Sequence, residues 1–188
     1  MGTPREAPPS KLFMAIMHRP GFDPAPVLGR LAERYGPVES RCPPFLFDGS
    51  RYYEPEMGSG LIKFFVSFKD LFPQERLVEA KLATGELESR ESDARGRVCN
   101  IDPGIVTHYS VILATTKGYA HRVYLGRGVY AEATLLFRRG ALESLPWTYP
   151  DYRGGVVQSF FTEARRILLK QLSGADASGA SVSVNFTF

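Results

Sequence analysis

Residues 61–68 of this 188-residue chain read L-I-K-F-F-V-S-F, and this run predicts the strongest β-strand of the protein. Aromatic and β-branched side chains favour the pleated surface of a sheet. A second apolar run, K-L-F-M-A-I-M at residues 11–17, is long enough for a buried central strand. The elements around these two runs therefore decide which fold class the chain can adopt.

Between the two runs the pattern predicts a helix and then a strand. Asp23-Pro24 is a good helix start, apolar side chains follow at helical spacing, and Gly36 is a stop signal. Residues 38–47 are a strand candidate that two prolines interrupt. The first half of the chain thus alternates between short elements of both kinds.

After residues 61–68 a second helix and another strand are expected. Pro73 opens a helix in which Lys81 shares one side with apolar residues. Residues 97–101 form a strand that we expect to end in a turn at residues 102–104. The order from residue 11 to 101 is β-α-β-β-α-β, as in the ferredoxin-like fold. An α+β protein follows, with an antiparallel-rich sheet and helices on one face.

The second half adds a β-hairpin and a packing helix to this ferredoxin-like core. Residues 110–116 read as a strand, with a short helix as the alternative. Two β-rich runs flank Gly126-Arg127-Gly128, which is a hairpin signal. Apolar residues at helical spacing predict a long amphipathic helix over 157–172. We therefore expect a flexible tail at 1–10, one α+β domain at 11–172 and a Gly/Ala/Ser-rich C-terminal extension at 173–188.

Composition excludes several classes of protein. The chain has 23 Lys and Arg against 20 Asp and Glu, a net charge of +3, which gives nonspecific nucleic-acid binding little support. Two cysteines are too few for a disulfide framework, and the N-terminus lacks the apolar core of a signal peptide. No apolar stretch approaches the roughly 20 residues of a membrane span. We expect a cytoplasmic protein that does not contact membranes, with cofactor and oligomeric state left open.

The predicted hairpin places a cation opposite Glu132. A three-residue loop sets Arg122 across from Glu132, whereas a two-residue loop sets His121 there. The simpler interpretation is a cross-strand ion pair. The functional one is that Glu132 orients His121 or Arg122 toward a ligand.

Three further segments gather polar and aromatic residues. Residues 100–104 (N-I-D-P-G) either hydrogen-bond within their own loop or present an amide and a carboxylate at the edge of the sheet. Residues 147–153 (W-T-Y-P-D-Y-R) either cap the last helix and cover the core or offer stacking faces beside charges. Residues 48–56, with aromatic and acidic side chains, are either a solvated turn or a source of metal-binding carboxylates.

These motifs resemble a family. NIDPG at 100–104 and PWTYPDY at 146–152 are similar to the two signature motifs of an uncharacterised prokaryotic domain-of-unknown-function family of about this length. Residues 113–117, 121–125 and 130–132 also match, and the resemblance covers residues 10–172. It implies no established activity. Some members are labelled GTP-binding, but this sequence has neither a GxxxxGK[ST] phosphate loop nor an NKxD motif.

The resemblance shifts the interpretation toward a shared ligand surface, because the signature residues are mostly polar or aromatic. We expect a small-molecule site for an anionic, nucleotide-like ligand, with His121 as the acid or base and Glu132 holding it. The expected ligand-binding residues are Asn100, Asp102, Lys117, Arg122, Trp147, Tyr149, Asp151 and Tyr152. Asp102 and Asp151 would bind a polar group or Mg²⁺.

Two other functions remain open at this level. The βαββαβ order is also that of an RNA-recognition module, and Phe64, Phe65 and Phe68 lie on one predicted strand. The signature segments could instead form the interface of a structural or partner-binding protein.

Overall fold

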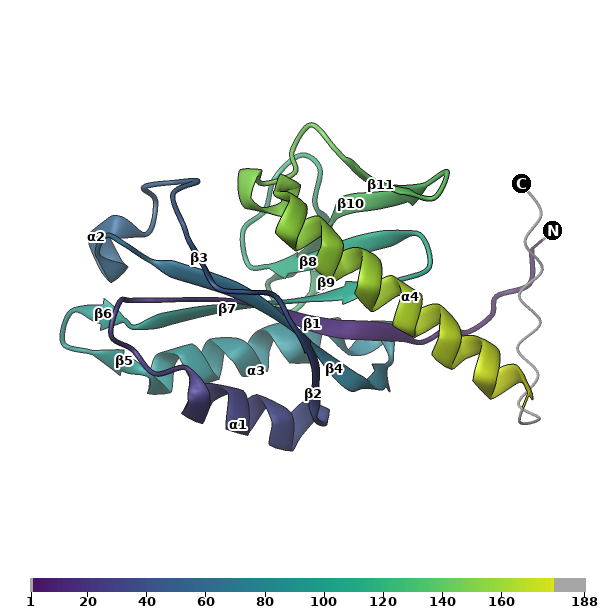
Figure 1. Ribbon diagram of the computed structural model, residues 1–188, viewed down its shortest axis with the longest axis horizontal. Helices are drawn as coiled ribbons and strands as arrows, with labels where there is room; N and C mark the ends of the chain where they lie inside the picture. Colours follow the sequence, from purple (N-terminus) through teal and green to yellow (C-terminus); the bar gives the residue numbers. More distant parts are fainter. Residues whose placement is uncertain (1, 178–188) are drawn as a thin grey trace.

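The apolar run at residues 11–17 forms the centre of a large antiparallel sheet (Figure 1). The computed structural model describes residues 2–177, with side chains as far as 174. Strand β1 (Ser10–His18) pairs with β4 (Ile62–Phe72) on one side and with β7 (Cys99–Val106) on the other. Every residue of β1 is buried, as expected for a strand covered on both faces.

The remaining strands extend the sheet on both sides of this centre. The order is β11-β10-β8-β7-β1-β4-β2, with β3 added to β4 and β9 added to β10. The added strands are β2 (Val38–Arg41), β3 (Phe45–Leu46), β8 (Ser110–Thr115), β9 (Val123–Gly126), β10 (Val129–Arg138) and β11 (Ala141–Ser144). Two short strands, β5 (Ser92–Asp93) and β6 (Gly96–Arg97), form a separate ribbon.

Helices cover both faces of the sheet. Helices α1 (Ala25–Tyr35) and α3 (Leu77–Arg90), the latter after the 3-10 helix η1 (Gln74–Arg76), lie on one face, and α4 (Gly155–Ala177) crosses the other (Figure 1). Helix α2 (Glu54–Met57) and the 3-10 helix η2 (Pro150–Arg153) are short elements within loops. Our expectation of helices on one face was therefore wrong for α4.

Strand periodicity explains the two-sided core. Met14 and Ile16 of β1 belong to the cluster under α1 and α3, whereas Phe13 packs with Phe161 of α4. Successive side chains of a strand point to opposite faces, so one apolar run supplies both cores. The sheet thus has no large open face in its central part.

Most predicted elements occur where the sequence placed them. Gly36, at φ 88°, ends α1, and the two prolines separate β2 from β3. Residues 110–115 are a strand and not a short helix. In the β9–β10 hairpin Tyr124 pairs with Tyr130, the register expected for the three-residue loop.

The NIDPG segment is the main correction, because it is not a turn. Strand β7 runs through it to Val106. Gly104 is required for packing, since a Cβ at this position would lie 2.3 Å from Cζ of Phe13 and 2.5 Å from the carbonyl oxygen of Ile112. The motif is therefore part of the sheet and not a loop beyond it.

The ends of the chain refine the predicted boundaries. Residues 173–177 belong to α4, while the rest of the predicted C-terminal extension, residues 178–188, lies outside the described residues. Ser10 already begins β1, so the predicted tail is one residue shorter. No helix in the described part of the chain is both long and apolar enough to cross a membrane.

Candidate functional site

A split between β7 and β8 creates the candidate site. The two strands pair only from Gly104 with Leu113 to Val106 with Val111. Thr107 donates its N–H across to Ser110, and alternate residues of an antiparallel strand present their N–H groups to the same neighbour. Pro103 occupies such a position but has no N–H, so it cannot continue the ladder. Beyond Pro103 the two strands separate.

A carboxylate from α3 replaces the missing strand. The next N–H that would face β8 belongs to Ile101, and it donates to Oε1 of Glu88 at 2.7 Å. Glu88 is 5% exposed, and its burial, the largest influence, raises the pKa of its carboxyl group. A buried backbone donor is thereby satisfied by a side chain, as buried polar groups require.

A cavity of 660 Å³ lies at this split. Its walls come from β7, β8, α3, the segment around α2, and the PWTYPDY segment. Four cationic side chains line it: Lys63, Lys81, Arg97 and Lys117. Three acidic ones, Glu88, Asp102 and Asp151, stand among them. The volume falls within the range of small-molecule sites.

Asp102 is the centre of the polar network on the β7 wall. Its two carboxylate oxygens accept hydrogen bonds at 2.7 Å from Nζ of Lys81 and Nδ2 of Asn100. Arg97 in turn donates to Oδ1 of Asn100 at 2.9 Å and to Glu88 at 2.8 Å. The carboxylate orientation is thus fixed from several elements.

The charges of this network are stabilised by one another. Burial, the largest single influence, acts to raise the pKa of Asp102. The Lys81 ammonium and the hydrogen bonds act in the opposite direction and together outweigh burial, so the pKa of Asp102 lies below its ordinary value of 3.8. Burial acts to lower the pKa of Lys81, but Asp102 and Glu88 raise it above its ordinary value. Asp102 and Lys81 therefore form a charged pair at neutral pH.

A second ion pair, between Lys63 and Asp151, also lines the cavity. Nζ of Lys63 donates to Oδ2 of Asp151 at 2.6 Å, and both side chains are largely buried. The same ammonium lies 5.2 Å from the ring centre of Tyr152. Tyr152 is 1% exposed and stacks on Phe161, so its ring belongs to the core under α4. The PWTYPDY segment thus joins the cavity to the core.

Aromatic rings and a lysine stand at the mouth of the cavity. Nζ of Lys117 lies 3.7 Å above the ring centre of Tyr52, a cation–π geometry. Among the described residues we find no carboxylate paired with Lys117. The α2 segment is held in place by Glu56, which makes a bidentate ion pair with Arg97 at 2.7 and 2.8 Å. The mouth therefore combines an exposed cation with stacking surfaces.

A separate cluster surrounds the buried carboxylate of Glu132. Oε2 of Glu132 accepts from Nε of Arg122 at 2.7 Å and lies 3.1 Å from Nε2 of His121. The sequence offered these two cations as alternatives, and both contact the carboxylate. His121 also stacks on Trp147 at 4.8 Å, and Arg122 donates to the hydroxyl of Tyr149 at 2.6 Å. Tyr149 is the direct link between this cluster and the cavity.

The predicted site residues therefore fall into two groups. Those lining the cavity are Asn100, Asp102, Lys117, Tyr149, Asp151 and Tyr152. Those in or beside the Glu132 cluster are His121, Arg122, Glu132 and Trp147. Trp147 is held by a hydrogen bond from Nε1 to the carbonyl of Ala133. The catalytic roles of His121 and Glu132 stay predictions.

Several cavity residues were absent from the predicted set: Tyr53, Lys63, Lys81, Glu88 and Arg97. For two of them the sequence carried a signal. Lys63 is the only charged residue in the run 61–68, and Lys81 lies on the apolar side of its helix. A lone charge on an apolar surface must find a partner. Which partner it finds depends on the tertiary fold.

The two aspartates predicted to bind Mg²⁺ are not part of a cluster of metal ligands among the described residues. Asp102 and Asp151 line one cavity, but each accepts a hydrogen bond from a lysine. Within residues described here, no group of three or more His, Cys, Asp or Glu side chains could hold a metal ion.

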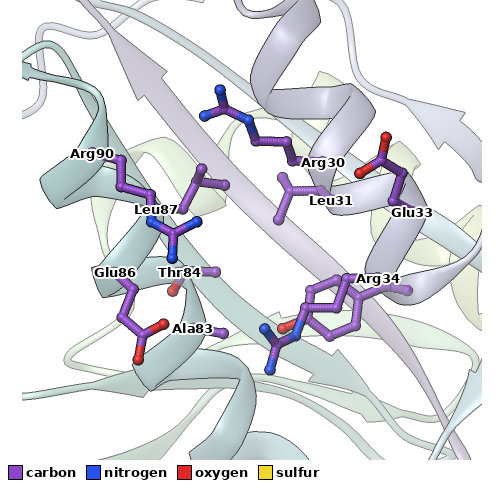
Figure 2. A pocket seen from close by; sticks show the side chains of 10 residues that line it. Arg30, Leu31, Glu33, Arg34, Ala83, Thr84, Glu86, Leu87 and Arg90 are labelled. Atoms are coloured by element: carbon purple, nitrogen blue, oxygen red, sulfur yellow. The ribbon is translucent and has the colours of Figure 1, made fainter.

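A second cavity of 470 Å³ lies between α1 and α3. Figure 2 shows Leu31 of α1 and Leu87 of α3 facing each other across it, with arginine side chains around them. None of the predicted site residues lines this cavity.

The fold and the site together define a class: an α+β domain in which a split antiparallel sheet holds a charged, aromatic-walled cavity. The chain belongs to the family described as Domain of unknown function (DUF4416), whose model matches residues 8–168. This confirms the family expected from the sequence. No curated protein matches the chain, and no solved structure matches it.

Proposed function

We propose that the cavity between β7 and β8 binds a small anionic ligand that carries a planar group, such as a nucleotide. The observation that carries the proposal is Lys117, which has no carboxylate partner among the described residues and stands beside tyrosine rings at a cavity of 660 Å³. Small-molecule sites typically pair an aromatic lining with a few convergent polar groups.

The roles follow from the contacts of each side chain. Lys117 at the mouth is free of a carboxylate partner among the residues described, so it offers uncompensated positive charge to an approaching anion. Both Tyr52, which is 63% exposed, and Tyr149, which is 36% exposed, line the cavity and offer stacking faces. Arg122 would act through Tyr149, which it contacts directly.

The finer fold assignment also belongs to this proposal. The four strands β7-β1-β4-β2, crossed by α1 and α3 on one face, support a ferredoxin-like core to which β8–β11 and α4 are added. A cytoplasmic location fits two buried free cysteines, Cys42 and Cys99.

A ligand screen tests the proposed function. Nucleotides, sugar phosphates and divalent ions are each added to the full chain, and the melting temperature is measured. We expect at least one nucleotide to raise it in proportion to the logarithm of its concentration. Lys117→Gln should lower the affinity for that nucleotide about tenfold, which is the effect expected from losing one charge-assisted contact.

Lys170→Gln is the matched control, because Lys170 is an exposed lysine on α4, away from the cavity. It should leave ligand affinity unchanged. The absence of a shift with every compound, or equal losses in both variants, would contradict the proposal.

The RNA-binding alternative loses its supporting residues. Phe64, Phe65 and Phe68 are each 0% exposed, beneath the helices of the two faces, and are not available for base stacking. A partner-binding role stays a prediction. Exposed apolar side chains on β9, Val123 and Tyr124, are the surface on which it would depend.

A further inference from the structure

One side chain in the cavity wall has a polar atom that the fold does not use. Tyr152 is 1% exposed, and none of the described residues offers its hydroxyl a hydrogen-bond partner. Its ring is well packed, stacked on Phe161 and edge-on to Phe65 at 5.1 Å. Phenylalanine would meet the same packing needs without the cost of an unpaired buried hydroxyl.

The hydroxyl lies in an environment that keeps it protonated. Burial, the largest influence, and the nearby carboxylates of Asp151 and Asp102 raise the pKa of Tyr152 well above its ordinary value. A neutral phenol at the wall of the cavity is a hydrogen-bond donor. This donor has no internal partner, and the side chain that carries it lines the cavity.

Other donors with spare protons stand beside it. Lys63 has three N–H groups, and the one hydrogen bond we find for it among the described residues goes to Asp151. The oxygen of Tyr149 accepts from Arg122, so its own proton remains to be donated. Lys63, Tyr149 and Tyr152 all line the same cavity. The Tyr149 and Tyr152 ring centres lie 6.0 Å apart, and Nζ of Lys63 lies 5.2 Å from the ring centre of Tyr152. The three donors therefore line one region of the cavity, and an oxyanion requires several donors close together.

We propose that this end of the cavity is an oxyanion subsite, in which Tyr152 donates to a phosphate or carboxylate group of the ligand and Lys63, while it stays paired with Asp151, donates one of its remaining N–H groups to the same group. The inference rests on the proposed function and deepens it, because it states where the anionic group of the ligand binds. The planar group would then lie toward Tyr52 and Lys117 at the mouth.

Tyr152→Phe tests the subsite, because it removes one oxygen and keeps the ring. The melting temperature of the unliganded variant should be no lower than that of the wild type. Inorganic phosphate and malonate are then titrated separately into the full chain, and the melting temperature is measured at each concentration. We expect one of the two anions to stabilise the wild type, and we expect Tyr152→Phe to lower the affinity for that anion about tenfold. Phosphate alone would indicate a phosphate ester as ligand, and malonate alone a carboxylate.

Tyr35→Phe is the matched control, since Tyr35 has a buried hydroxyl at the cavity between α1 and α3. It should not change the response to either anion. Equal anion affinity in the wild type and Tyr152→Phe, or no stabilisation by either anion, would overturn the subsite. Nucleotide binding that Tyr152→Phe leaves intact would uphold the proposed function and reject only the subsite.

Discussion

Within the NIDPG motif each residue has its own physical task. Pro103 ends the ladder with β8, Gly104 makes room for Phe13, and Asp102 and Asn100 carry the polar network of the cavity wall. Ile101 points into the core and gives its N–H to α3. A motif that the sequence suggested as a turn is therefore the place where strand β7 borders the cavity.

The Asp102–Lys81 pair predicts a dependence of stability on pH. Because the pKa of Asp102 is lowered by folding, its stabilising contribution is present above the ordinary value of 3.8 and is lost as the pH falls through the folded-state value. Asp102→Asn should lower the free energy of unfolding at pH 7 by about 1.5–3 kcal/mol, as for a hydrogen bond to a charged group. Urea denaturation from pH 7 to pH 2 should show this difference shrinking below about pH 4.

Glu143→Gln is the control for this series. Its carboxylate is exposed and lies 3.7 Å from Arg138. The change should stay within about 0.5 kcal/mol at every pH. A difference for Asp102→Asn that is constant across the whole pH range would rule out the ion pair as its cause.

Contacts set by local turn geometry can be predicted from the sequence, whereas contacts between distant elements cannot. A contact between Glu132 and either His121 or Arg122 could be predicted, because hairpin pairing follows from local turn geometry once the loop length is given. The partners of Lys81 could not, because they lie 20 or more residues away on another element. Local rules carry no information about which distant carboxylate a buried ammonium meets.

At the scale of elements, α4 covers the face of the sheet opposite to α1 and α3. It packs Phe160, Phe161 and Ala164 against the β1–β4 part of the sheet. The helical spacing of its apolar residues predicts the helix from the sequence alone. The face it covers was not, because periodicity defines an apolar stripe but not the surface that the stripe meets.

Phe161→Ala should remove the main contact of α4 with the sheet. The ring is 0% exposed, lies 4.9 Å from Phe13, and stacks on Tyr152 at 5.7 Å. We expect a loss of about 3–5 kcal/mol in the free energy of unfolding, measured by urea denaturation. Val156→Ala, at a side chain 55% exposed, should cost less than about 0.5 kcal/mol. Similar costs for the two variants would show that α4 is not part of the cooperative core.

At the scale of the whole molecule, stability should differ between the central sheet and the segment at the cavity mouth. Amides of β1, which is paired on both sides, should exchange with deuterium only through global unfolding. Residues 48–58 contain a single four-residue helix and are tied to β6 by Glu56 and Arg97. They should exchange faster, through local opening.

Native-state hydrogen exchange with mass spectrometry measures both regions at once. Arg97→Gln should speed exchange at residues 48–58, because it removes the ion pair with Glu56. It should leave β1 unchanged, because the other partners of Arg97, Glu88 and Asn100, lie in the cavity wall and not on β1. Protection of residues 48–58 equal to that of β1 would show that the mouth unfolds only with the whole protein.

The sequence by itself determined the α+β class, the family, the central strand and the presence of the β9–β10 hairpin. These properties follow from periodicity, turn chemistry and motif identity, all of which act over a few residues. Only the tertiary structure decided where the site lies. Pro103 separates β7 from β8, and α3, α2 and the PWTYPDY segment meet at the gap. That convergence comes from packing between distant segments, which no local pattern encodes.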